Sequence, residues 1–293
     1  MPAPVSPMGR IEIPDRWRDL DAEGWRGPVL VLGASDTGKS TFARYLYDRL
    51  GVAHGRIAYL DGDVGQSHIG PPATLTLALS GDASTFPPGG PQRRWFVGSN
   101  SPVGHMLPLV TGVARLVDFA TAEGATATVI DTTGLVHPGQ GGAALKWALV
   151  DLLRPCTVVG FQRREELEPI LAPLRRLPDL AVHTLPVAAA VRERSREERI
   201  AHRTAQYRDY FKHARRMSLA YADLAVFPRI AFRPGRLAAL EDREGFTLAL
   251  AVVDQAREGR VWLHTPWQGD EEVCVLRLGD LALDLNTYKD ARI

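Results

Sequence analysis

The chain has 293 residues, of which 45% are hydrophobic and 24% charged, and its formal net charge at pH 7 is +1. This length suits one large α/β domain with a small appendage. The near-neutral balance excludes a protein whose whole surface attracts nucleic acid, so any basic binding surface must be local. Two widely separated cysteines, Cys156 and Cys274, favour a reducing compartment. Without a signal-peptide core or an apolar run of bilayer length, we expect a soluble, cytoplasmic protein that binds no membrane.

The elements predicted along the chain alternate between strands and helices. Residues 1–26 are polar with two tryptophans and predict a short helix docked on the core. An α/β domain is expected over 27–226, and a small β-rich appendage over 227–293. The expected strands of the first part are 28–32, 57–61, 95–97, 128–131, 157–161 and 181–185, and its expected helices are 39–50, 104–123, 142–153 and 164–176. Residues 82–92 predict a loop, and the expected appendage strands are 246–253, 261–264, 273–278 and 281–285.

Residues 33–41 read GASDTGKST, the full phosphate-loop pattern G-x-x-x-x-G-K-[ST], between an expected strand and an expected helix. Glycines let such a loop curl until its amides point at phosphate oxygens, and the helix dipole adds positive potential. Lys39 is then expected to reach the β- and γ-phosphates and Ser40 to ligate magnesium. We therefore expect a bound nucleoside triphosphate, held by Gly33, Ala34, Ser35, Asp36, Thr37, Gly38, Lys39, Ser40 and Thr41.

The run LDGDVGQ places Asp61, Asp63 and Gln66 after the strand at 57–61. Ligands of open α/β sheets bind beyond the carboxyl ends of the strands. One carboxylate is then suited to hold magnesium or its water, and the other to accept a proton from an incoming hydroxyl. The alternative is an acidic turn in which Asp61 caps and Asp63 is solvated.

A second acidic strand end reads Asp131-Thr132-Thr133-Gly134. An apolar strand that ends in aspartate is the usual magnesium-side partner of a phosphate loop. We expect Asp131 to bind the ion through water and the two threonine hydroxyls to face the same crevice. The alternative is a strand-ending turn rich in hydrogen-bonding side chains.

A basic run covers residues 192–216, with nine Lys or Arg against four Asp or Glu. Arg199 and Arg203 are four residues apart and share one helix face, and Arg194 lies five residues before Arg199. A mobile lid at about 190–216 that carries these arginines would neutralise a transferring phosphoryl group. The alternative is a solvated helix with internal ion pairs.

Small polar residues, Ser101 among them, follow the expected strand at 95–97 and suit a loop that faces substrate. Trp95 and Phe96 offer base stacking, although aromatic residues on strands more often belong to the core. Motifs for guanine reading, zinc binding and a Ser/His/Asp triad are missing. The nucleophile is therefore expected to belong to the substrate.

Together these motifs resemble the P-loop polynucleotide 5′-hydroxyl kinases over residues 17–211. GASDTGKST resembles the phosphate loop of that family, LDGDVGQ its D-x-D-x-G-Q element, FVGSNSP its aromatic-x-G-x-x-[ST]-P segment and TTG its clasp. The spaced arginines before Tyr210-Phe211 resemble its lid. Eukaryotic members usually follow the clasp glycine with tryptophan, whereas this chain has Leu135.

The resemblance implies a P-loop NTPase three-layer domain with a mostly parallel sheet, an arginine-bearing helical lid and a small C-terminal β-rich appendage. It implies transfer of the γ-phosphoryl group of ATP, or another NTP, with Mg²⁺, to the 5′-hydroxyl of RNA or DNA. Asp63 would be the base, with Gln66, Thr132, Thr133 and Ser101 on the substrate side and Ser40, Asp61 and Asp131 on the metal side. Gln66 would also contact the nucleotide. The rivals are an NTPase or kinase with another acceptor and an ATP-holding scaffold of an RNA-processing assembly. Oligomeric state and nucleotide preference stay open.

Overall fold

The computed structural model describes residues 13–81 and 86–293. The chain forms two compact units whose segments interleave along the sequence. The first unit comprises the residues up to Gly62, 77–92 and 113–193, and the second comprises 63–76, 93–112 and 194–293. None of the described helices is long and apolar enough to cross a bilayer.

The first unit is built on parallel strands, which are β1 (Gly27–Gly33), β2 (Ile57–Asp61), β5 (Ala127–Asp131), β6 (Thr157–Gln162) and β7 (Ala181–Pro186). The full sheet order is β4-β3-β2-β5-β1-β6-β7, where β3 spans Thr74–Leu79 and β4 spans Gln92–Phe96. The central strands are continuous buried runs, as expected for a sheet covered on both faces.

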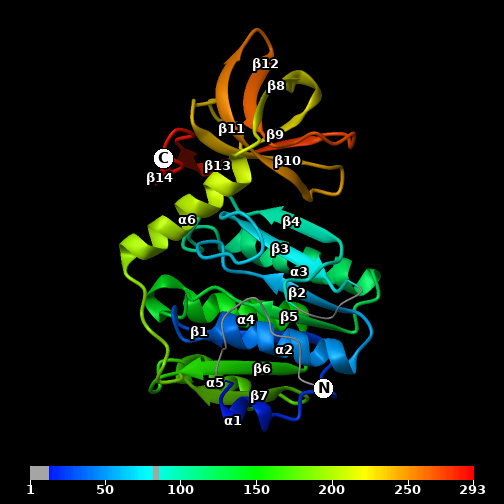
Figure 1. The fold of residues 1–293 in the computed structure, drawn as a ribbon, viewed down its shortest axis with the longest axis vertical. Coiled ribbons are helices and arrows are strands. Elements are labelled where there is room, and N and C mark those ends of the chain that lie inside the picture. The colour runs from blue at the N-terminus through cyan, green and yellow to red at the C-terminus, as the bar shows by residue number, and fades with distance from the viewer. Residues whose placement is uncertain (1–12, 82–85) are drawn as a thin grey trace. The chain divides into compact units, whose positions relative to one another are not determined.

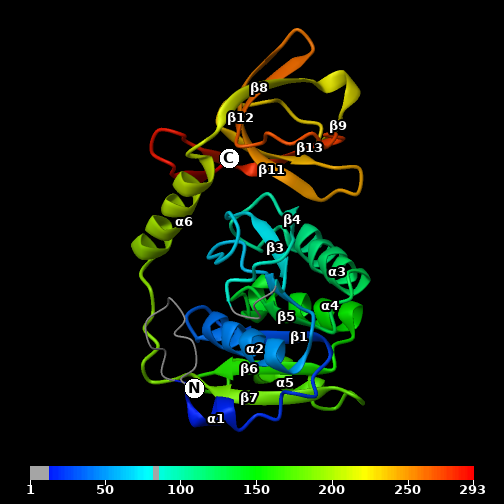
Figure 2. The ribbon, with the colours of Figure 1, turned by 45° about the vertical axis from the view of Figure 1, so that its right-hand side comes forward.

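The helices of this unit lie on both faces of the sheet (Figures 1 and 2). Helix α2 (Lys39–Ala53) connects β1 to β2, and α4 (Gly142–Leu153) connects β5 to β6 in the opposite direction along the sheet. Because such crossovers are right-handed, the two helices cover opposite faces. Helix α5 (Glu168–Leu174) packs beside α4. The loop after β1 therefore opens at the carboxyl ends of the strands.

Trp17 on helix α1 (Asp15–Arg18) is buried, with its ring centroid 5.1 Å from that of Phe42 and 5.9 Å from that of Phe161. Trp25 stacks on His183 at 5.1 Å. The expected short helix near the N-terminus is thus present as α1. Residues 1–12 of the expected docking segment lie outside the described residues.

The second unit contains helix α3 (Met106–Ala122) in part, helix α6 (Arg196–Phe211) and a second sheet, ordered β14-β13-β10-β11-β12-β8 with β9 beside β13. Its strands are β8 (Arg215–Ala220), β9 (Ala225–Phe227), β10 (Arg236–Glu241), β11 (Thr247–Arg257), β12 (Arg260–Thr265), β13 (Val275–Leu283) and β14 (Asp290–Arg292). Tyr207 and Phe211 of α6 are buried against residues of this sheet, among them Leu237, Leu250 and Leu281.

Most predicted strands and helices are confirmed within one to three residues. The prediction for α5 was too long, because Glu166 accepts hydrogen bonds from the backbone N–H of Arg163 and Arg164 and Pro173 lies in its last turn. The two strands expected at 273–278 and 281–285 form a single strand, β13, which continues through Gly279 without a turn. Strands β3, β8, β9, β10 and β14 were not predicted. The second sheet also includes β8, which precedes the expected start at Phe227, and β9, which ends at that residue.

In the predicted loop at 82–92, residues 82–85 lie outside the described residues. Residues 86–91 form no regular structure, and Gln92 begins β4.

Candidate active site

The phosphate loop joins β1 to α2, as predicted. An added Cβ at Gly33 would lie 2.7 Å from Thr37 Oγ1 and 2.9 Å from the Phe161 carbonyl oxygen, so only glycine fits there. Gly38 has a φ of 85° and precedes the first turn of α2. Lys39 Nζ donates to the Ala34 carbonyl oxygen at 2.7 Å, so the ammonium lies over the loop. A glycine-bearing loop at a helix N-terminus, with a lysine ammonium held against it, suits phosphate.

Asp61 and Asp131 end adjacent parallel strands and are register partners. Both are buried, and the backbone N–H of Gly62 donates to the Asp131 carbonyl oxygen at 2.8 Å. Burial raises the pKa of Tyr59 well above its usual value, and the charges of Asp131 and Asp61 add to that rise. The strand ends therefore form a local negative centre. No cluster of three or more His, Cys, Asp or Glu is present among the described residues.

Gly134 of the TTG run lies against the phosphate loop. A Cβ added at Gly134 would come within 2.8 Å of the Ser35 backbone nitrogen. The Thr132 hydroxyl donates to the Val31 carbonyl oxygen at 2.8 Å, and the Thr133 Oγ1 accepts from the backbone N–H of Leu135 at 3.3 Å. The first bond holds the carboxyl ends of β1 and β5 together, and the second lies within the turn that follows β5. Substrate binding by the two threonines stays a prediction.

Lys146 was not predicted as a site residue. It lies on α4, its side chain is fully buried, and its Nζ donates to Thr132 Oγ1 at 3.0 Å and to the Thr133 carbonyl oxygen at 2.7 Å. A lysine is almost never buried without a specific polar partner. The available signal was a single lysine inside the apolar run AALKWALV.

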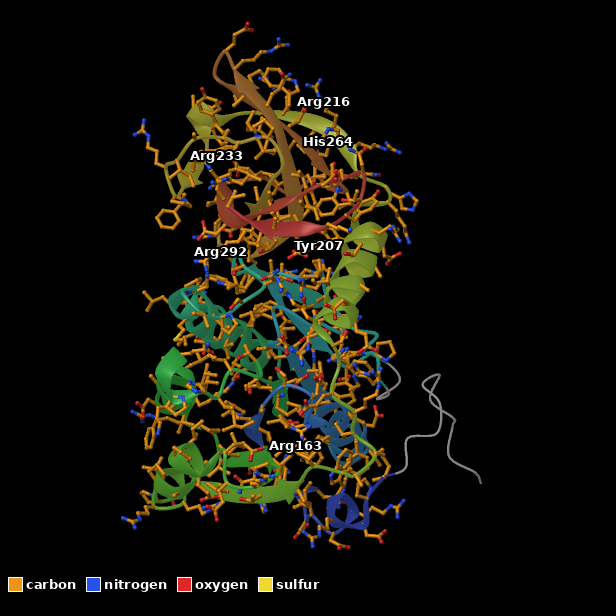
Figure 3. All side chains as sticks on the ribbon, turned by 90° about the vertical axis from the view of Figure 1, so that its left-hand side faces the viewer. Arg163, Tyr207, Arg216, Arg233, His264 and Arg292 are labelled. Carbon is orange, nitrogen blue, oxygen red and sulfur yellow. The ribbon has the colours of Figure 1, made fainter. Side chains whose placement is uncertain are left out.

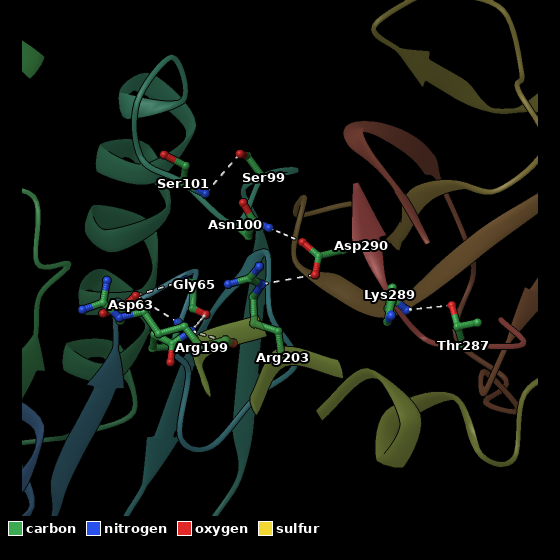
Figure 4. Close-up of polar contacts among 11 residues, drawn as sticks. Asp63, Gly65, Ser99, Asn100, Ser101, Arg199, Arg203, Thr287, Lys289 and Asp290 are labelled. Carbon is green, nitrogen blue, oxygen red and sulfur yellow. Dashed lines mark hydrogen bonds and ion pairs between the residues drawn. The ribbon is translucent and has the colours of Figure 1, made fainter. Parts of the chain in front are cut away.

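In the second unit, Asp63 organises the turn that follows β2. Its Oδ1 accepts the backbone N–H of Gly65 at 3.0 Å and of Gln66 at 3.1 Å (Figure 4). An added Cβ at Gly65 would lie 2.7 Å from the Asn100 carbonyl oxygen, so glycine is required at this close approach. The two amide bonds fix the orientation of the Asp63 carboxylate.

Helix α6 carries two of the three predicted lid arginines and begins with a capping box formed by Ser195 and Glu198. Arg199 and Arg203 lie one turn apart on this helix, whereas Arg194 precedes it and does not share its face. Arg203 Nε lies 3.2 Å from Asp290 Oδ1, and the side chain of Asp290 is 3% exposed. Figure 4 shows Arg199 beside the Asp63 turn.

Three hydrogen bonds fasten α6 to the segment that carries Asp63. Gln66 Nε2 donates to the Arg199 carbonyl oxygen at 3.2 Å, and Gln206 Nε2 donates to the Ser67 carbonyl oxygen at 2.7 Å. His202 Nε2 lies 3.2 Å from that same oxygen. The predicted base, the predicted glutamine and the helix with two of the predicted arginines therefore belong to one unit.

The segment after β4 also belongs to the second unit. Ser99 Oγ accepts the backbone N–H of Ser101 at 3.2 Å, and Ser101 Oγ accepts that of Val103 at 3.3 Å. The Asn100 side-chain amide donates to Asp290, which was not predicted as a site residue (Figure 4). Phe96 is buried in the core of this unit, which favours the core interpretation of that aromatic residue.

The parallel sheet, with its phosphate loop and acidic strand ends, defines a P-loop nucleotide-binding protein. The profile of the family described as mRNA cleavage and polyadenylation factor CLP1 P-loop matches residues 33–213. The chain belongs to this family. The matched range contains the residues that were predicted as phosphate loop, base, clasp and lid.

Sequence relatives support the same assignment. The chain is 31% identical over 217 residues to a polyribonucleotide 5'-hydroxyl-kinase of Methanocaldococcus jannaschii, covering 74% of this chain and 58% of the relative. It is 32% identical over 199 residues to that of Pyrococcus furiosus, covering 68% and 54%. The human polynucleotide 5'-hydroxyl-kinase NOL9 is 30% identical over 138 residues, covering 46% and 19%. The chain thus spans little more than half the length of the archaeal relatives.

Solved structures show the same fold. The wild-type Clp1p–Pcf11p (454–563) complex contains a chain that matches with a TM-score of 0.66 at 14% identity, covering 92% of this chain and 76% of that one. At this identity the likeness concerns the fold alone.

Proposed function

We propose that this protein is a polynucleotide 5′-hydroxyl kinase that transfers the γ-phosphoryl group of ATP, or another NTP, to the 5′-hydroxyl of RNA or DNA. The observation that carries the proposal is the fastening of α6, with Arg199 and Arg203, to the turn that orients Asp63. A base suits the deprotonation of an acceptor hydroxyl, and guanidinium groups suit the neutralisation of a transferring phosphoryl group. Here both belong to one unit. The printed names of the relatives support this reaction.

On the nucleotide side, the loop amides and Lys39 would hold the β- and γ-phosphates. Ser40, Asp61 and Asp131 would hold Mg²⁺, which supplies charge neutralisation of the phosphate oxygens when bound. Lys146 would keep Thr132 and Thr133 in place beside the phosphate loop, since its two hydrogen bonds end on them. Most of the rate acceleration in such a reaction comes from positioning and electrostatics.

On the acceptor side, the 5′-hydroxyl oxygen attacks the γ-phosphorus and its proton passes to the Asp63 carboxylate. A new P–O bond forms at the 5′ end while the bond between the γ-phosphorus and the β–γ bridging oxygen breaks, and the diphosphate leaves. Arg199, Arg203 and Arg194 would offset the charge that spreads over the transferring group. Gln66 and Ser101 would contact the acceptor strand.

Both cysteines are free thiols, which supports a cytoplasmic location.

The test incubates the purified protein with Mg²⁺, γ-labelled ATP and 5′-hydroxyl RNA or DNA oligonucleotides. Lys39→Ala and Asp63→Asn run in parallel, and the same oligonucleotides with a 5′-phosphate are the matched control. Label that appears only on 5′-hydroxyl ends, and is lost in both variants, supports the kinase. The Asp63→Asn variant should still bind ATP, because its change lies on the acceptor side.

Two results would contradict the proposal. ATP hydrolysis that 5′-hydroxyl oligonucleotides leave unchanged would favour an NTPase or a kinase with another acceptor. Tight ATP binding without hydrolysis, transfer or exchange would favour a scaffold.

A further inference from the structure

One face of the second sheet carries arginine and aromatic side chains on three neighbouring strands. Because residues two apart on a strand share a face, Arg260, Trp262 and His264 of β12 lie together. Register pairs place Arg216 of β8 opposite His264 and Arg257 of β11 opposite Arg260. We call these five residues the Arg–Trp face. Figure 3 shows Arg216 and His264 close together on this sheet.

Two guanidinium groups lie within 6 Å of the indole centroid of Trp262. The guanidinium carbon of Arg257 lies 5.2 Å from the Trp262 ring centroid, and that of Arg216 lies 5.8 Å from it. Arg216 Nε also donates to Asp254 Oδ2 at 2.7 Å. Arg260 Nη2 donates to Ser218 Oγ at 2.9 Å. The arginines are therefore held in place on the face, and their side chains remain largely exposed.

The core of the unit does not explain this face. The intervening residues of β12, Val261 and Leu263, are buried, and Met217 and Leu219 of β8 pack against them on the opposite side of the sheet. Strands β8 and β12 thus pack through their other face, whereas the face of His264 continues on β11 to Val252, which is buried under α6. Three arginines against the carboxylate of Asp254 leave the Arg–Trp face locally positive, although the whole chain is near neutral.

Single-stranded nucleic acid has the complementary chemistry. Its phosphates bind guanidinium groups through paired charge-assisted hydrogen bonds, and its unstacked bases stack on aromatic rings. We propose that the Arg–Trp face binds the single strand of the acceptor, with Trp262 as a stacking platform and Arg216, Arg257 and Arg260 on its phosphates. This rests on the proposed function, since it names a second contact for the same polynucleotide. The face also follows the lid along the chain, because β8 begins four residues after α6 ends.

The binding test uses the full chain and a fluorescent 5′-hydroxyl RNA of about 20 nucleotides, longer than the site size of one small binding domain. Fluorescence anisotropy over a salt series measures affinity and its salt slope. Trp262→Ala is expected to weaken binding about tenfold, and Trp262→Phe to restore most of it. Arg257→Ala/Arg260→Ala is expected to weaken binding and to reduce the salt slope by about 1.4, the value for two lost phosphate contacts on a single strand. Arg243→Ala is the matched control, because this exposed arginine pairs with Glu272 elsewhere in the unit.

Phosphoryl transfer to an acceptor of about four nucleotides separates this proposal from the kinase proposal, since so short a strand offers few phosphates to a second contact. The Arg–Trp variants should transfer to it at the wild-type rate. If wild type fails to transfer, the kinase proposal fails, and the anisotropy measurement still decides whether the face binds RNA. Unchanged affinity for the long RNA in both Trp262→Ala and Arg257→Ala/Arg260→Ala would overturn the proposal in favour of a protein partner or a solvated face. The double arginine variant keeps the test valid if Trp262→Ala misfolds, because both arginines are exposed.

Discussion

Arg203 of α6 and Asp290 of β14 form an ion pair across 87 residues of sequence, with Arg203 Nε 3.2 Å from Asp290 Oδ1. The same carboxylate accepts the Asn100 amide, so one buried group joins the lid helix, the segment after β4 and the last strand (Figure 4). Because the Asp290 carboxylate is buried and accepts from both Arg203 and Asn100, it fixes the positions of these two side chains.

Asp290→Ala is therefore expected to destabilise the protein by about 1–3 kcal/mol, because it leaves a partly buried guanidinium and amide without their acceptor. Urea denaturation measures the loss. Asp209→Ala is the control, since Asp209 pairs with Lys212 at an exposed position and should cost less than about 1 kcal/mol. An equal loss of unfolding free energy in the two variants would show that the Asp290 pair stabilises the fold no more than an exposed pair does.

The glycine of the TTG run supports the phosphate loop. Gly134→Ala should weaken ATP binding about tenfold or more, because the new methyl group would displace the Ser35 backbone from its position. Gly55→Ala is the control, as nothing lies within 4 Å of a Cβ added there. Isothermal titration with ATP and Mg²⁺ measures both. Wild-type affinity in Gly134→Ala would mean that the loop tolerates this shift.

Lys146→Met should destabilise the fold by about 1–3 kcal/mol, since the Thr133 carbonyl oxygen loses its buried donor. It should also slow phosphoryl transfer, because Thr132 and Thr133 are then less well held. Thermal unfolding and the labelled-ATP assay check the two effects. Lys212→Met, at an exposed lysine, should change neither.

Stability should depend on pH through Glu168. Hydrogen bonds from Arg175 at 2.7 and 3.0 Å, and a further one from Gln162, lower the pKa of Glu168 from 4.5 to about 2. A depressed folded-state pKa stabilises the fold above pH 4.5, and this contribution disappears as the pH falls from 4.5 towards 2. The loss in Glu168→Gln, less than about 1 kcal/mol for a partly exposed pair, should thus be present at pH 7 and vanish in acid. Denaturation at several pH values measures it, and a loss independent of pH would rule out this linkage.

The features that were predicted correctly from the sequence are those defined by short spacings between residues. The phosphate loop, the two acidic strand ends and the arginines four residues apart each lie within a few residues, and the buried strands have a continuous apolar pattern. The fold class and the family assignment followed from these motifs. The roles predicted for the individual site residues, such as Asp63 and Ser101, remain predictions.

What the sequence did not predict depends on distant partners. Asp290 and Asn100 meet 190 residues apart, and no local pattern marks Asp290 as buried. Lys146 lies on a helix face that only the packing on the sheet defines. Strand β8 begins inside the basic run, at Arg215, and its two leading arginines conceal the alternation of inward and outward residues.

The bonds from α6 to the Asp63 segment join positions 133 and 139 residues apart. Two stretches of chain that lie far apart in the sequence are therefore held together as one structural part. A graft of α6 alone from a relative keeps the bonds to the Ser67 carbonyl oxygen only where it supplies donors at positions 202 and 206, whereas a graft of both stretches together brings each donor with its acceptor. Exchange of acceptor specificity between family members should thus require the two stretches as a pair.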